Sequence, residues 1–292
     1  MNSQARPGSP AHSVLGWREG RTPFGDASLA TYASGRSDAG APVVLFVHGM
    51  GHWTQAAWDG IARQLGATHR CIAFDLPGFG ASDRPKAAYT LAYFQAALRC
   101  VVAGAGLERF SLVGHSLGGL IAADYAAREG SRVRLLALID PAGFLRTSSF
   151  VLRVAASRPV TSVLGRLRPS RRFVRRTLTS AVYNPASVPE TMHERAFALS
   201  QDPALVRAFA SVYAGAMHEL LHLDALHERL AAWHGSTLLV WGREDRYIPV
   251  RALAVARRVY PQADVLELPK CGHCPNIEAP AIVTARLLAN GV

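Results

Sequence analysis

Ser116 has the sequence context of a reactive serine. It lies in GHSLG, residues 114–118, between an apolar, strand-like segment at residues 110–114 and a helical segment that begins at Leu117. A serine in such a tight strand-to-helix turn has a strained backbone and presents its hydroxyl beside the positive end of the helix dipole. The residues two positions to either side must be small, because strand and helix pass close together, and both are glycine. The context therefore predicts that Ser116 is a nucleophile.

Five segments together carry a resemblance to a known family. They are HGMG (48–51), DLPGFGASDRP (75–85), GHSLGG (114–119), WGREDRYIP (241–249) and CGHCPNIEAP (271–280). They resemble the α/β-hydrolase superfamily, most closely its branch of small bacterial esterases, C–C bond hydrolases and cofactor-free haloperoxidase-like enzymes. The resemblance runs from about Trp17 to the C-terminus and is weakest through residues 145–222. Its motifs are specific for the fold and the catalytic machinery, but not for the substrate.

The resemblance also implies the partners of Ser116. His273 matches the histidine loop of the family, and Asp245 matches the acid position that follows the strand-like segment at residues 236–241. The order Ser, Asp, His along the chain is the one that this fold uses. Two alternatives for the acid stay open. Glu244 is the neighbour of Asp245, and Asp140 ends an earlier strand-like segment from which some relatives take their acid.

These residues predict nucleophilic catalysis at a carbonyl carbon. A serine hydroxyl is a weak nucleophile until a base takes its proton, so we expect His273 to act as the base. We expect Asp245 to hold the imidazole in the correct tautomer and to stabilise its charged form. The tetrahedral oxyanion then needs preorganised donors. We expect them to be the backbone N–H groups of Leu117, directly after the nucleophile, and of Met50, in the glycine-rich loop at residues 48–51.

A different motif has the spacing of a zinc site. HELLH at residues 218–222 matches H-E-x-x-H, in which two histidines one helical turn apart bind zinc and the glutamate acts as general base. A third ligand is missing, because the long form of this motif needs Gly and His where the sequence has Ala225 and Glu228. We therefore expect a helix with two incidental histidines.

Cys271 and Cys274 form a C-x-x-C pattern around His273. Disulfide oxidoreductases place this motif at a helix start early in a thioredoxin-type unit, whereas here it lies about twenty residues from the C-terminus. We expect both to be free thiols, together with Cys71 and Cys100. The alternative is a disulfide that strains the histidine loop, so that dithiothreitol would change the rate.

The segments that must position these residues alternate between strand-like and helical patterns. Apolar runs typical of buried strands lie at residues 42–47, 70–74, 110–114, 133–140, 236–241 and 264–268, after two short strand-like pieces near residues 17–18 and 28–33. Helical patterns separate the runs, which predicts an α/β fold with βαβ units and a parallel sheet. The family resemblance makes this an eight-stranded, mostly parallel α/β-hydrolase sheet flanked by helices.

The alternation stops between residues 145 and 222, where the sequence is helical, rich in arginine and interrupted by prolines. The resemblance implies a helical cap, inserted after the sixth strand, that covers the active site. We therefore expect a flexible lead-in at residues 1–16, a core domain formed by residues 17–144 and 223–292, and a cap at residues 145–222. Apolar pieces of the cap favour a mainly hydrophobic pocket.

The nucleophile narrows the substrate class. Haloalkane dehalogenases and epoxide hydrolases resemble this chain elsewhere but carry Asp at the position of Ser116. We predict hydrolysis of a carboxylic ester of a small to medium, largely apolar molecule, because this demands only the triad and the oxyanion hole. The alternatives are a C–C bond hydrolase of a meta-cleavage-type diketone, a lactonase or thioesterase, and a non-catalytic accessory protein.

The composition limits which binding partners and which cellular location we expect for the protein. The chain has 292 residues, of which 49% are hydrophobic, and a formal net charge of +11 carried almost wholly by arginine. A GC-rich genome gives the same arginine excess, so we expect no nucleic-acid partner. We interpret the arginines at residues 166–176 as a solvent-exposed face of the protein. The alternative is that they form a binding site for acidic groups. No apolar run reaches the roughly 18 residues of a membrane span, and the N-terminus lacks a secretory signal. We expect a cytoplasmic protein without metal or organic cofactor; a homo-oligomer stays open.

Overall fold

The central strands are short apolar runs that are buried on both faces. The computed structural model describes residues 16–51, 53–145 and 168–292. Its strands are β1 (Arg18–Phe24), β2 (Ala27–Gly35), β3 (Val43–Val47), β4 (Arg70–Phe74), β5 (Phe110–His115), β6 (Val133–Ile139), β7 (Ser236–Gly242) and β8 (Asp264–Leu268). All six residues of β5 are buried, as are four of the five in β3. Parallel sheets covered on both faces select such continuous apolar strands.

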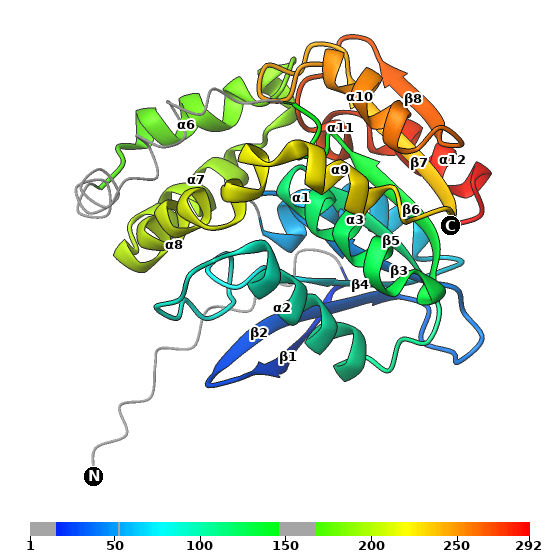
Figure 1. Cartoon of the computed structure of the whole chain (residues 1–292). Helices are drawn as coiled ribbons and strands as arrows, with labels where there is room; N and C mark the ends of the chain where they lie inside the picture. Colours follow the sequence, from blue (N-terminus) through cyan, green and yellow to red (C-terminus); the bar gives the residue numbers. More distant parts are fainter. Residues whose placement is uncertain (1–15, 52, 146–167) are drawn as a thin grey trace.

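The strands form one sheet in the order β1-β2-β4-β3-β5-β6-β7-β8 (Figure 1). β2 runs antiparallel to both of its neighbours, whereas the strands from β4 to β8 are parallel. The predicted eight-stranded, mostly parallel sheet is confirmed. Because parallel strands end at the same edge, the loops that follow β3, β5, β6, β7 and β8 meet there, which is where open α/β sheets bind ligands.

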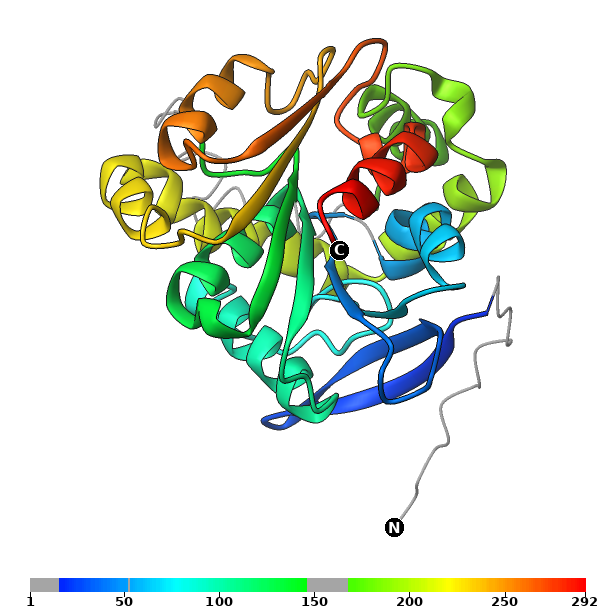
Figure 2. The ribbon, with the colours of Figure 1, turned by 90° about the vertical axis from the view of Figure 1, so that its right-hand side faces the viewer.

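Helices cover both faces of this sheet (Figure 2). They are α1 (Thr54–Leu65), α2 (Leu91–Gly104), α3 (Leu117–Glu129), α6 (Arg171–Ser180), α7 (Glu190–Ser200), α8 (Pro203–Ala214), α9 (Leu223–Leu230), α10 (Arg251–Val259), α11 (Pro275–Glu278) and α12 (Pro280–Ala289), with 3₁₀ turns η1 (Gly130–Arg132), η2 (Pro185–Ser187) and η3 (Ala216–Leu221). One face packs against α2, α3, α9 and α10, and the other against α1 and α12. Each face buries its own apolar cluster, so the core has three layers.

A helical segment, α6 to η3, follows β6 before the chain returns to the sheet, as expected for an insertion after the sixth strand. It contacts the edge of the sheet where the parallel strands end. The ring of Phe209 in α8 lies 5.2 Å from that of Phe79, and the carbonyl of Ala181 accepts the N–H of His273 at 2.7 Å. The first part of the predicted cap, residues 146–167, lies outside the described residues.

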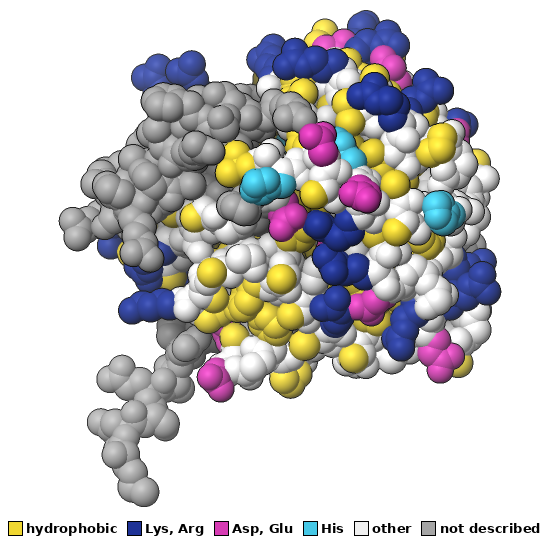
Figure 3. Space-filling view, in the orientation of Figure 1, with side chains coloured by type: hydrophobic (Ala, Val, Ile, Leu, Met, Phe, Trp, Pro, Cys, Tyr) yellow, Lys and Arg dark blue, Asp and Glu magenta, His cyan; other side chains and the backbone are white. Residues whose placement is uncertain are grey.

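The arginines of α6 are exposed, and two have partners on α7. Arg175 forms an ion pair with Glu190, and the guanidinium of Arg171 lies 4.4 Å from the centre of the Phe197 ring. On the face shown in Figure 3, Lys and Arg side chains form several separate groups with Asp and Glu side chains among them, and not one continuous basic patch. In the part of the chain that the structure describes, no helix has the length and apolar character needed to cross a membrane.

Candidate active site

Ser116 sits in a strained turn between β5 and α3. Its backbone has φ 53° and ψ −118°, which is unusual for a residue with a side chain. The turn is closed by glycine contacts: a Cβ on Gly118 would lie 2.2 Å from the carbonyl oxygen of Val47, and one on Gly114 would lie 2.4 Å from the carbonyl oxygen of Gly118. The glycines that the sequence places around Ser116 are therefore required for strand and helix to approach each other.

A chain of hydrogen bonds starts at this serine. Nε2 of His273 lies 3.0 Å from Oγ of Ser116, and Nδ1 of the same ring lies 2.7 Å from Oδ2 of Asp245. The other carboxylate oxygen, Oδ1, accepts the backbone N–H groups of Tyr247 at 2.7 Å and Ile248 at 2.9 Å. These bonds fix the carboxylate and leave its second oxygen for the imidazole. The structure thus brings together the three residues named from the sequence.

The two alternative acids have other hydrogen-bond partners. Glu244 accepts the N–H of Cys271 at 3.0 Å and so supports the histidine loop rather than the imidazole. Asp140, with φ 40°, accepts the N–H of Gly242 at 3.1 Å and is fully buried. Burial and the nearby charge of Asp245 raise its pKa well above the usual range. Of the three candidates, Asp245 is the one hydrogen-bonded to His273.

The loop at residues 48–51 passes directly beside the serine. A Cβ on Gly49 would lie 3.0 Å from Cβ of Ser116 and 2.7 Å from Nδ1 of His115, so only glycine fits there. Leu117 is the first residue of α3, and the first N–H groups of a helix have no intrahelical acceptor. The two segments predicted to bind the oxyanion, through Met50 and Leu117, thus flank Ser116; the donor role of the two N–H groups stays a prediction.

His48 braces this loop. Its Nε2 accepts the N–H of Leu76 at 2.9 Å, so Nδ1 carries the proton and donates to the carbonyl oxygen of Gly49 at 2.7 Å. Burial lowers the pKa of the imidazole, which keeps the ring neutral and able to accept. The loop after β3 is thereby tied to the loop after β4.

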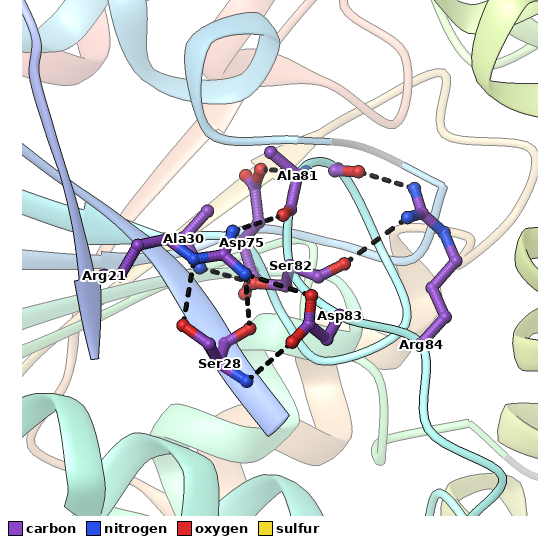
Figure 4. Close-up of polar contacts among 9 residues, drawn as sticks. Arg21, Ser28, Ala30, Asp75, Ala81, Ser82, Asp83 and Arg84 are labelled. Atoms are coloured by element: carbon purple, nitrogen blue, oxygen red, sulfur yellow. Dashed lines mark hydrogen bonds and ion pairs between the residues drawn. The ribbon is translucent and has the colours of Figure 1, made fainter. Parts of the chain in front are cut away.

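Asp75, at the end of β4, organises the second of these loops, a role that sequence reasoning missed. Its carboxylate accepts the N–H groups of Thr54 and Ala81, both at 2.7 Å, and the hydroxyl of Tyr32 at 2.9 Å. Figure 4 shows how Ser82 and Asp83 extend the network to β2. The only signal in the sequence was an aspartate directly after a buried strand, within the segment at residues 75–85.

The cysteines are free thiols, as predicted, so the disulfide alternative is not present. Cys271 and Cys274 are buried on either side of His273, and burial is the main cause that raises the pKa of both thiols. Neither is therefore a reactive thiolate near neutral pH.

The HELLH segment does not have the geometry of a zinc site. Residues 216–221 form the 3₁₀ helix η3, and His222 lies beyond its end. A 3₁₀ helix has three residues per turn, so positions four apart do not share a face. Glu219 instead pairs with Arg229 at 2.8 Å. Within residues 16–51, 53–145 and 168–292, the one group with the spacing of metal ligands consists of Asp140, Asp245 and His273, which is the site described above.

Comparison with known proteins gives the family. The alpha/beta hydrolase fold family model matches residues 42–280. A 2-hydroxy-6-oxo-2,4-heptadienoate hydrolase of Pseudomonas putida is 30% identical, over 82% of this chain and 85% of its own length, and Lipase 1 of Psychrobacter immobilis is 29% identical, over 85% and 76%. The crystal structure of a bacterial membrane phospholipase A has a TM-score of 0.74 and 27% identity, covering 94% of this chain and 86% of that one. The match to the family model spans most of the sequence, and the chain belongs to the alpha/beta hydrolase fold family.

Proposed function

We propose that the protein is a serine hydrolase that cleaves carboxylic esters of small to medium, largely apolar molecules through an acyl-enzyme. The observation that carries the proposal is the hydrogen-bonded chain from Oγ of Ser116 through His273 to Asp245. This is the arrangement by which a weak nucleophile is activated: a base within reach of the hydroxyl, held in one tautomer by a carboxylate.

The reaction follows from these contacts. His273 takes the hydroxyl proton as Ser116 attacks the ester carbonyl, and the imidazolium is stabilised by Asp245. The oxyanion of the tetrahedral intermediate is bound by the N–H groups of Leu117 and Met50. His273 then gives its proton to the leaving alcohol. Water, deprotonated by the same imidazole, attacks the acyl-enzyme and releases the acid.

The surroundings of the site support an apolar substrate. Met50 and Phe209 pack against the main apolar cluster, and the ring of Phe209 is 3.1 Å from the Cβ that Gly51 lacks, so α8 lies against the oxyanion loop. The segment from α6 to η3 would act as the cap, excluding water and completing an acyl pocket. Two relatives named lipase and phospholipase point to esters with apolar acyl groups.

A C–C bond hydrolase is the second candidate. It is favoured by the P. putida relative, which acts on 2-hydroxy-6-oxo-2,4-heptadienoate and has the highest identity of the relatives above. The two reactions share the triad but differ in the leaving group, which is an alkoxide for an ester and a dienolate carbon for the diketone. A dienolate needs polar partners beyond the triad and the oxyanion donors.

Covalent labelling tests the nucleophile. A fluorophosphonate probe should label the wild type and fail to label Ser116→Ala. Ser111→Ala is the matched control, because Ser111 lies buried on β5, five residues before the nucleophile. Absence of labelling in the wild type, or equal labelling of Ser116→Ala, would refute a serine hydrolase.

Turnover of two substrate sets then tests the bond. We expect kcat/KM for p-nitrophenyl esters to rise from acetate to medium-chain acyl groups and to exceed kcat/KM for a meta-cleavage dienone. Turnover of the dienone is measured as the loss of its visible absorbance. If the dienone is turned over faster than the esters, C–C hydrolysis replaces the ester proposal.

A further inference from the structure

The imidazole of His273 lies against the rings of His115 and Tyr247, which differ in exposure. Its centre is 4.9 Å from that of the His115 ring, and His115 is fully buried. It is 5.4 Å from the centre of the Tyr247 ring, and Tyr247 is 50% exposed. Nε2 of the same imidazole faces Oγ of Ser116 at 3.0 Å. The side of Tyr247, and not that of His115, is therefore the side on which the imidazole meets solvent.

Tyr247 is held at its backbone and at its hydroxyl. Its backbone N–H donates to Oδ1 of Asp245 at 2.7 Å, and its hydroxyl lies 2.8 Å from Oγ of Ser180, the last residue of α6. The next residue of that segment, Ala181, accepts the backbone N–H of His273 at 2.7 Å. The side chain of Tyr247 thus extends beside the imidazole, from the acid loop to the segment that we propose as the cap.

The hydrogen bonds of Ser180 determine which of the two hydroxyls is the donor. Oγ of Ser180 lies 2.8 Å from the carbonyl oxygen of Thr177, and a carbonyl oxygen can only accept. The single hydroxyl hydrogen of Ser180 is used in this bond, so the hydroxyl of Tyr247 donates to Oγ of Ser180. Among the residues that the structure describes, the Tyr247 hydroxyl has no other hydrogen-bond partner. Its oxygen is therefore an acceptor with a lone pair to offer.

The proposed reaction brings the alcohol part of the ester to this place. His273 gives its proton to the leaving alcohol, so the alcohol oxygen must come within hydrogen-bond distance of Nε2. The ring of Tyr247 is a direct neighbour of that imidazole, and its hydroxyl is on the half-exposed side chain. A second hydroxyl, on the carbon next to the ester-linked carbon, can bridge the space between Nε2 and the Tyr247 oxygen.

We propose that Tyr247 is a specificity residue that accepts a hydrogen bond from a hydroxyl of the leaving alcohol. The favoured substrates are esters of an apolar acid with a polyhydric alcohol, whose second hydroxyl is the donor. Ser180 enforces this choice, because it takes the phenol proton and leaves Tyr247 as an acceptor. The inference rests on the proposed function, since it names the alcohol of the ester that Ser116 cleaves.

Two esters that differ in one donor test the proposal. 2-Hydroxyethyl octanoate and 2-methoxyethyl octanoate have the same acyl group, but only the first can donate to Tyr247. We expect kcat/KM of the wild type to be about three- to tenfold higher for the hydroxyethyl ester, as is typical of one hydrogen bond. The ratio of the two kcat/KM values does not depend on the amount of active enzyme, so it can be compared between variants.

Tyr247→Phe keeps the ring beside His273 and the backbone N–H for Asp245 but removes the hydroxyl, so it should lower this ratio about three- to tenfold. Ser180→Ala frees the phenol proton, which can then be donated to the ether oxygen. Its ratio should fall because the methoxyethyl ester is hydrolysed faster, whereas a merely structural role would slow both esters alike. Tyr183→Phe is the matched control: it removes a similarly exposed phenol hydroxyl and should keep the wild-type ratio.

An unchanged ratio in Tyr247→Phe would overturn the proposal, as would a wild type that prefers the methoxyethyl ester. An unchanged ratio in Ser180→Ala would overturn the assignment of Tyr247 as an acceptor, and the proposal with it. A wild type that hydrolyses neither ester also overturns it, and fluorophosphonate labelling then shows whether the proposed function fails as well. A labelled wild type that hydrolyses both esters with ratios unaffected by the substitutions leaves the proposed function standing and removes only the role of Tyr247.

Discussion

The carboxylate of Glu278 accepts the backbone N–H of Gly272, the residue before His273, at 2.8 Å. Its other oxygen accepts the N–H of Tyr183 at 2.8 Å, in the segment that follows α6. One side chain on the short helix α11 therefore connects the histidine loop to the segment that follows α6 and fixes their relative position. The position of the imidazole depends on a contact with an element that lies about ninety residues earlier in the chain.

Glu278→Ala should weaken both the fold and the site. It leaves the N–H groups of Gly272 and Tyr183 without their charged acceptor, which we expect to cost about 2–4 kcal/mol in the free energy of unfolding. It should also lower kcat at least tenfold, since the His273 loop is released. Urea unfolding and ester turnover measure the two effects. The control is Glu267→Ala, which removes only an exposed ion pair with Arg243 and should change stability by less than about 1 kcal/mol. Equal effects of the two substitutions would contradict this role.

Gly118→Ala should prevent the nucleophile turn from forming. The added Cβ would lie 2.2 Å from the carbonyl oxygen of Val47, which is backbone of the neighbouring strand and cannot move aside. We expect a loss of about 3 kcal/mol or more in stability and no fluorophosphonate labelling. Gly40→Ala is the control, because a Cβ there meets nothing within 4 Å. A labelled, stable Gly118→Ala protein would show that the turn tolerates a side chain.

Asp245→Asn and Glu244→Gln should separate the catalytic acid from its neighbour. An amide at position 245 would donate to Nδ1 of His273 and so favour the wrong tautomer, which typically lowers kcat about 10⁴-fold. The Glu244→Gln variant keeps a side-chain oxygen for the N–H of Cys271, so its kcat should stay within about tenfold of the wild type. Steady-state kinetics on both variants decides between them. A larger loss in Glu244→Gln would transfer the role of the acid to that residue.

The thiols flanking His273 should be unreactive in the folded protein. Cys71, Cys271 and Cys274 are buried, whereas Cys100 is partly exposed, and burial raises the pKa of the Cys71 thiol to about 12. Titration with Ellman's reagent should therefore show one fast thiol, lost in Cys100→Ser, and four after denaturation. Because there is no disulfide to reduce, dithiothreitol should leave the rate unchanged. A rate that changes with dithiothreitol would point to oxidation in the histidine loop.

The sequence predicted the elements whose signal is local. The buried run of β3 consists of apolar residues and that of β5 is mostly apolar, and the residues of the nucleophile turn are consecutive in the chain. β1 was predicted only at its start, near Arg18, because this edge strand is mostly exposed and lacks an apolar pattern. The HELLH segment was expected to lie on a helix. Its first four residues belong instead to the 3₁₀ helix at residues 216–221, and α9 begins only at Leu223.

Contacts between distant residues carried no such signal. The choice among Asp245, Glu244 and Asp140 depends on the register between β6 and β7 and on which side chain faces His273. The roles of Asp75 and Glu278 likewise depend on backbone N–H groups that lie far away or follow a turn. No periodicity in the sequence encodes these distances, so the resemblance to a family was needed to name the acid.

Asp59 should make stability depend on pH. Burial in α1 is the main cause that raises its pKa to about 6, partly opposed by the hydrogen bond from Nε1 of Trp17. The unfolded state has a lower pKa, so the folded state binds more protons between about pH 4 and 6. The stability present below pH 4 is therefore lost as pH rises through this window. Asp59→Asn keeps the acceptor for Trp17 and should raise the free energy of unfolding by about 1 kcal/mol at pH 7.5, but not at pH 4, in urea titrations at both pH values. An equal gain at both pH values would mean that the effect is not the ionisation of this carboxyl.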